Sequence, residues 1–539
     1  MSMLNAVLGD EAISLGAIDS GLFACYGYPG TPSTEIMEFL IEQFKNIGKP
    51  IARWCVNEKT ALEGALGVSF AGKRSLVTMK HVGLNVAADP LINSALLGIN
   101  GGVVIAVADD PGMYSSQNEQ DSRFYADFAM LPCFEPRNQQ QAYDMTREAF
   151  ELSEKYHLPV IIRIVTRLSH ARSTIKRAPP ETAAVKERVR DTTEWLLLPE
   201  FSRRNYRSLI EKNTALQEWS RTHYSNKLET EEYDSSFVVI TAGLGGNYYE
   251  ENLAEILENG YTRPGRLHIG VYPIPVDSIN KLCANAKKLL IIEEGQPLIE
   301  NKIRGILPSS IEINGKLNGK LPRVGELDPD NVRSALGLHP VQNMPAALNI
   351  KIPVRAPQLC KACPHEDSYK AINIALAIYD TGKRSVLSDI GCYSLGAFPP
   401  YSAIESIVCM GASVSMARGA AEAGIEASVA VIGDSTFLHS GITAIIDAVS
   451  SNTAMTVIIL DNSSVAMTGC QETVLPSSKL KLLLLGLGVE DNHIVELESS
   501  SKNISFNSER LGAEISYRGI SVVIFRRECI ESLRMRHKK

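Results

Sequence analysis

The sequence predicts an α/β protein with several doubly wound parallel-sheet domains. Short apolar segments rich in Val and Ile alternate with segments whose apolar residues recur at helical spacing. The apolar segments end in polar residues or glycine-rich turns, as buried parallel strands do before a crossover helix. The pattern also restarts twice, after a charged stretch and after a proline-rich stretch. Together these observations indicate alternating strands and helices in more than one domain.

The composition limits the classes of partner. The chain has 539 residues and a formal net charge of −7, and its pI is near 5.9, which argues against nucleic acid as the main partner. Its first residues turn acidic too soon for a secretion signal. The apolar run at residues 482–487 is far shorter than the ~20 residues of a membrane helix. We therefore expect a cytoplasmic protein that does not contact a membrane.

Residues 1–177 are predicted to form the first doubly wound domain. A Gly/Pro turn, GYPGTPS at residues 27–33, opens a helix at Thr34. The predicted strands of this domain lie at residues 51–56, 75–79, 103–108 and 159–165.

Glu58 is the candidate acid of this domain. It follows the strand at residues 51–56 and precedes a helix rich in small residues, over which a flat group has room to approach. A carboxylic acid in a partly apolar cleft has a raised pKa and can donate a proton. The alternative is an exposed glutamate that places negative charge at a helix N-terminus. The residues alone leave both interpretations open.

Further domain boundaries follow from shifts in composition. Residues 178–235 are charged or polar and are predicted to be a helical surface linker. Residues 236–326 form a small α/β domain whose turn at residues 243–246 is too incomplete to predict dinucleotide binding. The remaining parts are a linker at residues 327–357, a last α/β domain at residues 358–529 and a basic tail at residues 530–539.

The last domain contains a strand–helix–strand unit with metal-type ligands at both strand ends. The strand at residues 427–432 leads into GDS at residues 433–435, and the strand at residues 455–460 ends just before Asn462. Adjacent parallel strands bring such ends together at the carboxyl edge of the sheet. A carboxylate, an amide oxygen and a turn carbonyl suit Mg²⁺ that takes its other ligands from phosphate and water. An ordinary polar turn is the alternative.

These motifs resemble those of thiamine diphosphate enzymes, and the whole set resembles the α subunit of indolepyruvate ferredoxin oxidoreductase, in the 2-oxoacid:ferredoxin oxidoreductase superfamily. The resemblance extends over essentially the whole chain to about Cys529. It is carried by residues 27–33 (GYPGTPS), 56–59 (VNEK), 79–90 (MKHVGLNVAADP), 115–123 (SSQNEQDSR), 363–365 (CPH), 389–392 (DIGC), 433–435 (GDS) and 460–462 (LDN).

The resemblance implies domains of the thiamine diphosphate-binding type. Residues 1–177 match the pyrimidine-binding domain, and residues 358–529 match the domain that binds the diphosphate and magnesium. Residues 236–326 match a small domain like the C-terminal domain of transketolase, which binds no nucleotide.

The resemblance also assigns roles to single residues. Glu58 is implied to activate the cofactor, and His81 to act near the reaction centre. The implied substrate contacts are Thr31, Asn85 and Arg123. The implied ligands of Mg²⁺ are Asp434, Asn462 and the backbone carbonyl of Ser464. The implied contacts to thiamine diphosphate are Met410, Gly411, Gly433, Asp434, Ser435 and Asn462.

The activity implied by the resemblance is the oxidative decarboxylation of aryl pyruvates. Coenzyme A is the cosubstrate, the product is an aryl-acetyl-CoA, and electrons pass through iron–sulfur centres to ferredoxin. The implied partners are a small β subunit and ferredoxin, in a homodimer or heterotetramer. Two alternatives remain: a non-oxidative thiamine diphosphate-dependent decarboxylase or lyase, and a silent paralogue that serves only in assembly.

The sequence departs from the family pattern in two places. Members usually continue into a cysteine-rich ferredoxin-like module, and this sequence reaches Lys539 without one, so we expect another route for the electrons. A second departure is Cys470, which begins a Cys-Gln-Glu run where His and Pro are expected and puts the substrate preference in doubt.

The ten cysteines are expected to be buried thiols or metal ligands rather than disulfides. Four of them occupy the places where the superfamily's cofactor-binding subunits often bind a proximal cluster. Four thiolates can ligate a [4Fe-4S] cluster, and buried thiols without metal are the alternative. The four candidate ligands are Cys360, Cys363, Cys392 and Cys529.

Overall fold

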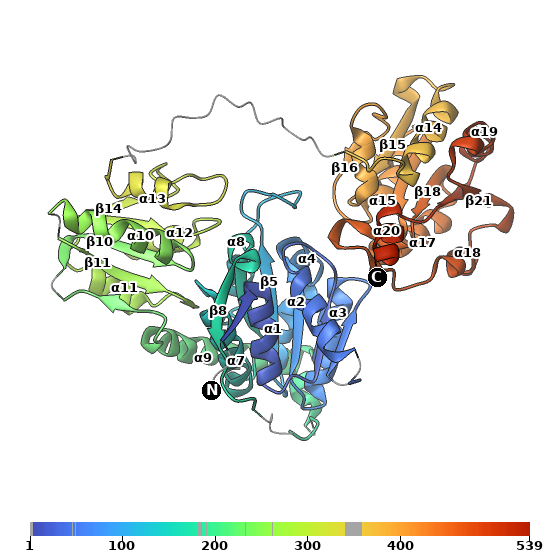
Figure 1. Cartoon of the computed structure of the whole chain (residues 1–539). Coiled ribbons are helices and arrows are strands. Elements are labelled where there is room, and N and C mark those ends of the chain that lie inside the picture. The colour runs from blue at the N-terminus through green and yellow to red at the C-terminus, as the bar shows by residue number, and fades with distance from the viewer. Residues whose placement is uncertain are drawn as a thin grey trace. The chain divides into compact units, whose positions relative to one another are not determined.

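The chain folds into two compact units, residues 1–348 and residues 349–539. Figure 1 draws both in a computed structural model of the protein. The structure describes residues 4–538 except 46, 49, 182–185, 190, 232, 261 and 340–357. Most of the predicted linker at residues 327–357 therefore lies outside the described residues.

A seven-stranded, mainly parallel sheet forms the centre of the first unit and confirms the predicted strands. Its order is β12-β6-β7-β5-β4-β2-β3. β5 and β7 are buried along their whole length, because helices cover both faces of the sheet. The strands are β2 (Ala24–Gly27), β3 (Ile51–Trp54), β4 (Ser75–Lys80), β5 (Val103–Asp109), β6 (Cys133–Phe134), β7 (Val160–Val165) and β12 (Val271–Tyr272).

Two of the helices around this sheet begin at asparagine caps. The Asn57 side chain accepts a hydrogen bond from the Thr60 amide at the start of α3, and Asn138 accepts one from the Gln141 amide at the start of α7. The helices of this region are α1 (Gly9–Asp19), α2 (Thr34–Phe44), α3 (Glu58–Phe70), α4 (His81–Val86), α5 (Ala88–Leu97), α6 (Arg123–Phe128), α7 (Gln139–Tyr156) and α8 (Thr166–His170).

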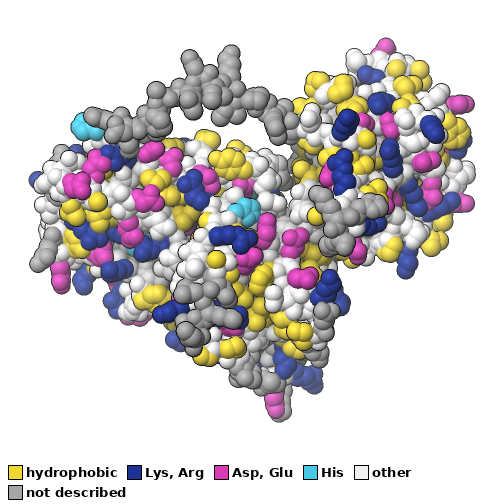
Figure 2. Space-filling model, viewed as in Figure 1, with side chains coloured by type: hydrophobic (Ala, Val, Ile, Leu, Met, Phe, Trp, Pro, Cys, Tyr) yellow, Lys and Arg dark blue, Asp and Glu magenta, His cyan; other side chains and the backbone are white. Residues whose placement is uncertain are grey.

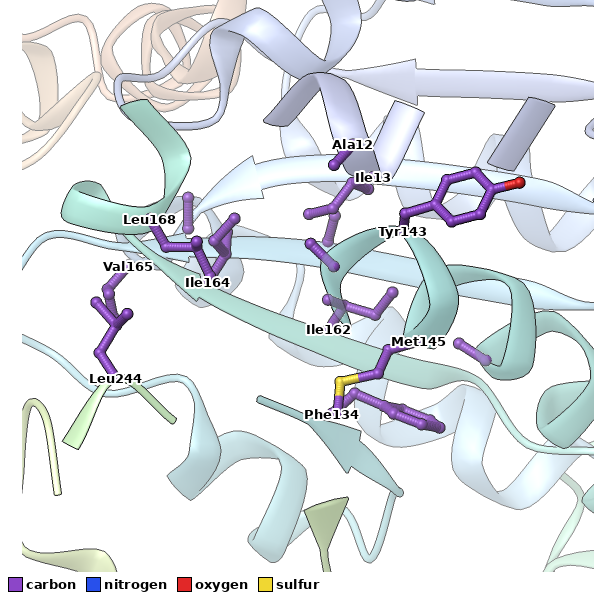
Figure 3. Close-up of a cluster of buried hydrophobic side chains, with 14 of the residues drawn as sticks. Ala12, Ile13, Phe134, Tyr143, Met145, Ile162, Ile164, Val165, Leu168 and Leu244 are labelled. Atoms are coloured by element: carbon purple, nitrogen blue, oxygen red, sulfur yellow. The ribbon is translucent and has the colours of Figure 1, made fainter. Parts of the chain in front are cut away.

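One core of the first unit lies between α1, α7 and β7. Ile13 of α1, Tyr143 of α7 and Ile162 of β7 are fully buried and belong to this one cluster (Figure 3). A short antiparallel pair, β1 (Leu4–Leu8) and β8 (Arg172–Lys176), lies near both ends of this domain's chain. Burial of so many Val, Ile and Leu side chains supplies the main stabilisation of this layer.

A second sheet of five strands corresponds to the predicted small domain. Its order is β14-β13-β10-β11-β9. Its strands are β9 (Leu228–Glu229), β10 (Asp234–Ala242), β11 (Pro264–Ile269), β13 (Lys288–Ile292) and β14 (Glu312–Asn314), and its helices are α10 (Gly245–Glu258), α11 (Val276–Cys283), α12 (Leu298–Ile303) and α13 (Pro329–Ala335).

The two sheets of the first unit are more closely joined than the predicted boundaries imply. β12 belongs in sequence to the small domain, yet it pairs with β6 of the seven-stranded sheet. α9 (Pro199–Thr222), in the predicted linker, buries Leu209 and Leu216 against the core that the two sheets share. The first unit is therefore one body with two large sheets and the small β1–β8 pair.

The second unit contains a six-stranded parallel sheet, as predicted, in the order β16-β15-β17-β18-β22-β21. Its strands are β15 (Arg384–Ser388), β16 (Ser406–Ile407), β17 (Ala427–Gly433), β18 (Met455–Asp461), β21 (Ile494–Glu498) and β22 (Ile520–Arg526). Its main helices are α14 (Pro364–Leu376), α15 (Ala412–Glu422), α17 (Ile442–Ser450), α18 (Leu480–Gly486), α19 (Ile504–Ile515) and α20 (Ile530–Lys538). The predicted basic tail thus contains α20.

The surfaces of both units mix charges of both signs. On the face shown in Figure 2, Lys and Arg side chains are interspersed with Asp and Glu. Within the described part of the chain, every helix is too short or too polar to cross a bilayer.

Candidate functional site

Three neighbouring strands of the six-stranded sheet each lead into an aspartate at their carboxyl ends. Asp389 follows β15, Asp434 follows β17, and Asp461 is the last residue of β18. Gly433 pairs with Leu460 in the sheet register, so Asp461 lies opposite Asp434. The sequence analysis selected Asn462, one residue further on, and did not select Asp461 or Asp389. Asp461 ends the apolar strand β18, whereas Asp389 follows the mixed strand RSVLS of β15.

Asp434 and Asp461 are buried carboxylates that are only partly satisfied. The Ser435 amide donates to Oδ1 of Asp434 at 2.8 Å, and the Ser477 hydroxyl donates to Oδ1 of Asp461 at 2.6 Å. Among the described residues, Oδ2 of each carboxylate has no hydrogen-bond partner. Burial, followed by the nearby charge of Asp461, raises the pKa of Asp434 well above its usual value. An added cation would relieve this cost.

Asn462 and Ser464 form the turn that follows β18. The Asn462 side-chain oxygen accepts a hydrogen bond from the Ser464 amide at 3.0 Å, and its Nδ2 lies 3.4 Å from Nε2 of His365. Burial lowers the pKa of His365 to about 4, so this histidine is neutral near pH 7. Ser463, which lies between Asn462 and Ser464, has a left-handed backbone conformation with φ of 58°.

The chemistry of these donors fits a hard divalent cation. Carboxylate, amide and carbonyl oxygens are the ligands that Mg²⁺ and Ca²⁺ prefer. Within the described part of the chain, no group of three or more His, Cys, Asp or Glu residues is placed to hold a metal ion. Protein carboxylates alone would thus leave a bound cation incompletely coordinated, and ligands from elsewhere are needed to complete it. Mg²⁺ commonly takes such ligands from phosphate and water.

Asp389 holds the start of α15. It accepts hydrogen bonds from the Ser413 hydroxyl at 2.7 Å and from the hydroxyl of Tyr393. Burial raises the pKa of Asp389 to about 6. Gly411 precedes α15 with φ of 85°, a conformation that favours glycine. The predicted cofactor contacts Met410 and Gly411 therefore lie on a turn that Asp389 fixes.

Gly433 is required by a close approach within the protein. A Cβ atom at this position would lie 2.5 Å from Cε1 of Tyr393. The sequence analysis assigned the glycine to the approach of a ligand, and the structure places an aromatic ring there. One π turn, Phe437–Gly441, follows Ser435, and such turns are frequent at functional sites.

The four predicted cluster cysteines are near enough to affect one another's pKa, but in the described part of the chain no three of them are placed to hold a metal ion. Burial raises the pKa of Cys392 to about 12, and the thiols of Cys363, Cys529 and Cys360 add to the effect. Cys363 and Cys529 are buried, whereas Cys360 is exposed. The Cys529 amide donates to the Asn462 carbonyl at 3.1 Å, which ties this cysteine to the turn after β18. Cys470 also acts on Cys392, so a fifth thiol faces the same region.

In the first unit, Glu58 begins α3 and is only 5% exposed. Its carboxylate packs against the backbone of α4, because a Cβ atom on Gly83 would lie 2.4 Å from Oε1 of Glu58. The alternative of an exposed glutamate is therefore wrong, although the residue does lie at a helix N-terminus. Its burial fits the interpretation as an acid in a cleft.

Of the other predicted residues of the first unit, His81 and Asn85 lie in α4 and Thr31 lies in the turn before α2. His81 is buried, its Nε2 lies 3.1 Å from the Asn118 carbonyl, and its Nδ1 has no hydrogen-bond partner among the described residues. The Asn85 side-chain oxygen accepts a hydrogen bond from the Tyr125 hydroxyl at 2.6 Å. The Thr31 carbonyl accepts one from the Ser115 hydroxyl at 3.2 Å.

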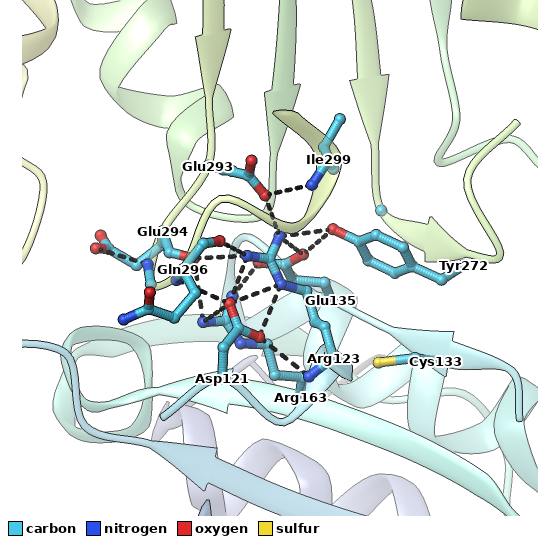
Figure 4. A network of polar contacts seen from close by, with 12 residues as sticks. Asp121, Arg123, Cys133, Glu135, Arg163, Tyr272, Glu293, Glu294, Gln296 and Ile299 are labelled. Carbon is cyan, nitrogen blue, oxygen red and sulfur yellow. Dashed lines mark hydrogen bonds and ion pairs between the residues drawn. The ribbon is translucent and has the colours of Figure 1, made fainter. Parts of the chain in front are cut away.

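Arg123 is the third predicted substrate contact of the first unit, and its side chain has no exposed surface. Its guanidinium donates to Asp121 at 2.6 Å and to the Tyr272 hydroxyl at 3.0 Å. It also donates to the carbonyls of Glu294 and Gln296 at 2.9 and 2.8 Å. Figure 4 shows it at the centre of a network between the two sheets of the first unit. This arrangement leaves no guanidinium surface for a substrate.

Comparisons with known proteins agree with this description. A family model described as "Pyruvate flavodoxin/ferredoxin oxidoreductase, thiamine diP-bdg" matches residues 16–234, and one described as "Thiamine pyrophosphate enzyme, C-terminal TPP binding domain" matches residues 389–481. The indolepyruvate oxidoreductase subunit IorA of Archaeoglobus fulgidus is 36% identical to the chain and matches 97% of it and 86% of its own length. The IorA subunit of Pyrococcus horikoshii is 33% identical, over 97% of this chain and 85% of its own.

A solved structure shows the same fold. The 2-oxoglutarate:ferredoxin oxidoreductase of Magnetococcus marinus, solved with 2-oxoglutarate, coenzyme A and succinyl-CoA bound, aligns with a TM-score of 0.52 at 18% identity. The alignment covers 62% of this chain and 65% of that one.

The fold, the two family models and the relatives define the class of protein. It is a thiamine diphosphate-dependent 2-oxoacid:ferredoxin oxidoreductase. Within that class, the chain belongs to the family of the indolepyruvate oxidoreductase subunit IorA.

Proposed function

We propose that the chain is the cofactor-binding subunit of an enzyme that oxidatively decarboxylates aryl pyruvates of the indolepyruvate type. Coenzyme A accepts the acyl group, and ferredoxin accepts the electrons. The observation that carries the proposal is the pair of buried carboxylates, Asp434 and Asp461, at neighbouring strand ends. Oδ2 of Asp434 has no hydrogen-bond partner among the described residues, and Oδ2 of Asp461 lies 3.7 Å from Nε of Arg526. The names of the relatives support the substrate class.

Thiamine diphosphate is proposed to bind the second unit through Mg²⁺ held by Asp434, Asn462 and the Ser464 carbonyl. Asp461 is added to this set, because its buried carboxylate lies beside Asp434 at the sheet edge and its charge acts on the pKa of Asp434. Gly433, Ser435, Met410 and Gly411 line the same edge and would contact the diphosphate. When bound, the cofactor supplies an electron sink for the loss of CO₂ from a 2-oxoacid.

In the first unit, Glu58 is proposed to hold a proton for the cofactor's aminopyrimidine ring. Its burial keeps the carboxyl group away from water and makes such a proton transfer specific. His81 has a buried Nδ1 that can hydrogen-bond the substrate. Thr31 in the turn before α2 and Asn85 in α4 would position the oxoacid.

The thiols of Cys360, Cys363, Cys392 and Cys529 are proposed to ligate a [4Fe-4S] cluster that takes electrons from the cofactor site. Thiolates are the usual ligands of such clusters, and the hydrogen bond from Cys529 to Asn462 ties this group to the proposed metal site. The proposed partners are a small β subunit, which the word subunit in the relatives' names supports, and ferredoxin. A homodimer or heterotetramer in the cytoplasm is expected.

The test uses the chain purified without oxygen together with its β subunit. We expect reduction of ferredoxin that requires indolepyruvate or phenylpyruvate, coenzyme A, thiamine diphosphate and Mg²⁺. Changing Glu58→Gln should lower kcat by about a hundredfold to ten-thousandfold, the usual range for a lost acid. The matched control is Glu63→Gln, one turn further along α3, where the side chain is half exposed and pairs with Lys59.

Equal activity of the Glu58→Gln enzyme and the wild type would contradict the proposed mechanism. The cluster is tested separately by iron and sulfide analysis and by the EPR spectrum of the reduced protein, with Cys392→Ala as the variant expected to lose the signal. An iron-free protein that decarboxylates without reducing ferredoxin would instead be the non-oxidative enzyme.

A further inference from the structure

A 2-oxoacid brings a carboxylate into the site, and a partly buried carboxylate needs a cationic partner. Arg123 is the only cationic residue among the predicted substrate contacts. In the structure the Arg123 guanidinium donates hydrogen bonds to Asp121, to Tyr272 and to two backbone carbonyls. Its side chain has no exposed surface. The proposed function therefore requires a different cation near Thr31 and His81.

Lys80 is a cation close to both Thr31 and His81. It is the last residue of β4 and directly precedes His81 and α4. Its stem packs against the turn that carries Thr31, because a Cβ atom on Gly30 would lie 3.0 Å from Cγ and from Cδ of Lys80. The side chain is only partly exposed, so a bound anion there would be shielded from water.

One further loop fixes the position of the Lys80 amine. Its Nζ donates to the Ser115 carbonyl at 2.9 Å, while the Ser115 hydroxyl lies 3.2 Å from both the Thr31 carbonyl and Oδ2 of Asp110. Lys80, Ser115 and Thr31 thus form one connected group. An ammonium has three hydrogens, and the bond to Ser115 uses one of them. The others remain to be directed at a ligand.

The charges that face Lys80 keep it cationic at neutral pH. Burial lowers its pKa to about 8, whereas the negative charges of Asp110 and Glu58 oppose this shift. Burial acts to raise the pKa of Asp110, but hydrogen bonds from Ser116, Ser115 and Thr166 lower it overall, so this carboxylate stays ionised. Its oxygens already accept those hydrogen bonds, at 2.7 to 3.2 Å.

We propose that Lys80 binds the carboxylate of the 2-oxoacid substrate, and that Arg123 instead joins the two sheets of the first unit. This inference rests on the proposed function and names the cationic residue of that same site. It assigns the neighbouring Thr31 loop and His81 to the rest of the substrate, because both adjoin Lys80 along the chain or through Ser115.

The test compares Lys80→Met, Lys80→Arg and the control Lys45→Met in the purified two-subunit holoenzyme. Lys45 is an exposed lysine of the same domain, beside the C-terminus of α2. We expect Lys80→Met to raise KM for indolepyruvate by about 10- to 100-fold, as the loss of a charge-assisted hydrogen bond does. Its kcat should change much less, Lys80→Arg should restore most of the affinity, and Lys45→Met should change neither constant.

Binding without turnover gives an independent result. The probes are indole-3-propionate, which carries a carboxylate but no keto group, and its neutral methyl ester, measured by calorimetry on the holoenzyme. Lys80→Met should weaken binding of the acid by the same 10- to 100-fold and leave binding of the ester unchanged. In the wild type, KM should also rise above about pH 8 as Lys80 loses its proton, and Lys80→Arg should remove this rise.

An active Lys80→Met enzyme with the wild-type KM and acid affinity would overturn the inference while leaving the proposed function intact. If Lys80→Met does not fold, Lys80→Arg decides the matter, because an unchanged rise of KM above about pH 8 would then exclude Lys80. Failure of the proposed function looks different: the wild type would show no oxoacid-dependent reduction of ferredoxin, and the inference would fall with it.

Discussion

Both units bury clusters of acidic side chains, and the two clusters are satisfied in opposite ways. In the first unit, Asp121 and Glu135 are paired with Arg123 and Arg163 in a network without exposed charge (Figure 4). In the second unit, Asp434 lies opposite Asp461, and each has a carboxylate oxygen with no hydrogen-bond partner among the described residues. A buried carboxylate that is fully paired indicates a structural contact between two parts of the fold. One that is left partly unpaired indicates a place for a ligand.

The network of the first unit joins its two sheets. Arg163 of β7 bonds Asp109 of β5 at 2.7 Å and also pairs with Glu135. Arg123 reaches Glu293 at 3.1 Å, and Glu293 in turn accepts the amides of Ile299 and Glu300 at the start of α12, each at 3.0 Å. Every charge of the network has an ion-pair partner supplied by the fold, although Oδ1 of Asp109 has no hydrogen-bond partner among the described residues. The network therefore needs no charge from outside.

The largest expected effect comes from opening this network. Arg163→Met leaves Asp109 buried without its cation and Glu135 with Arg123 alone. Breaking a buried pair in this way costs about 3–5 kcal/mol. We expect the free energy of unfolding, measured by denaturant titration of the full chain, to fall by that amount.

Arg534→Met serves as the control, because Arg534 forms an exposed ion pair with Glu531 and its removal should leave stability nearly unchanged. If both variants unfolded at the wild-type denaturant concentration, the network would not stabilise the contact between the two large sheets.

A smaller effect on stability is expected from changing a buried carboxylate of the second unit. Asp434→Asn removes a buried charge with no cation, so the ligand-free protein should be as stable as the wild type or more stable. The variant should lose the stabilisation that thiamine diphosphate and Mg²⁺ give the wild type, which is about 2.7 kcal/mol when the ligand is at 100 times its Kd. Thermal unfolding with and without the two ligands measures both effects.

Asp447→Asn in α17 is the matched control, since Asp447 is exposed on the same unit. A variant at Asp434 that retained the full ligand-induced shift would remove the distinction between the two clusters.

The smallest expected effect concerns His268 in β11, a buried base instead of a buried acid. Its Nδ1 lies 2.9 Å from the Thr241 hydroxyl, and its Nε2 has no hydrogen-bond partner in the described part of the chain. Burial, together with Arg266 and Arg137, lowers its pKa to about 3. The unfolded chain therefore binds a proton more readily, and stability falls as the pH drops from about 6.5 toward 3.

His268→Gln should remove this part of the acid sensitivity. The wild type should lose about 1 kcal/mol more than the variant for each pH unit below 6.5. Denaturant titrations at pH 7.0, 6.0 and 5.0 give the comparison, and parallel curves for the two proteins would show that His268 is not responsible.

The sequence was sufficient for the strands and for the placement of Asp434 and Asn462, because apolar runs fix the parallel strands and their polar ends meet at one edge. It was insufficient for Asp461, since only the register of β17 against β18 shows which residue lies opposite Asp434. It was also insufficient for Arg123, whose partners extend from Asp121 to Gln296 along the chain. No local pattern distinguishes an arginine that binds a substrate from one that joins two sheets.

The two-residue strand β12 limits how the domains of this chain can be removed or exchanged. Val271 and Tyr272 close the edge of the seven-stranded sheet although they lie in the small domain's stretch of chain. Excising that stretch would uncover β6 and leave an open row of backbone amides and carbonyls, the usual starting point for aggregation. The small domain is therefore not an interchangeable module, and a change in the length or order of this gene segment must preserve that one strand.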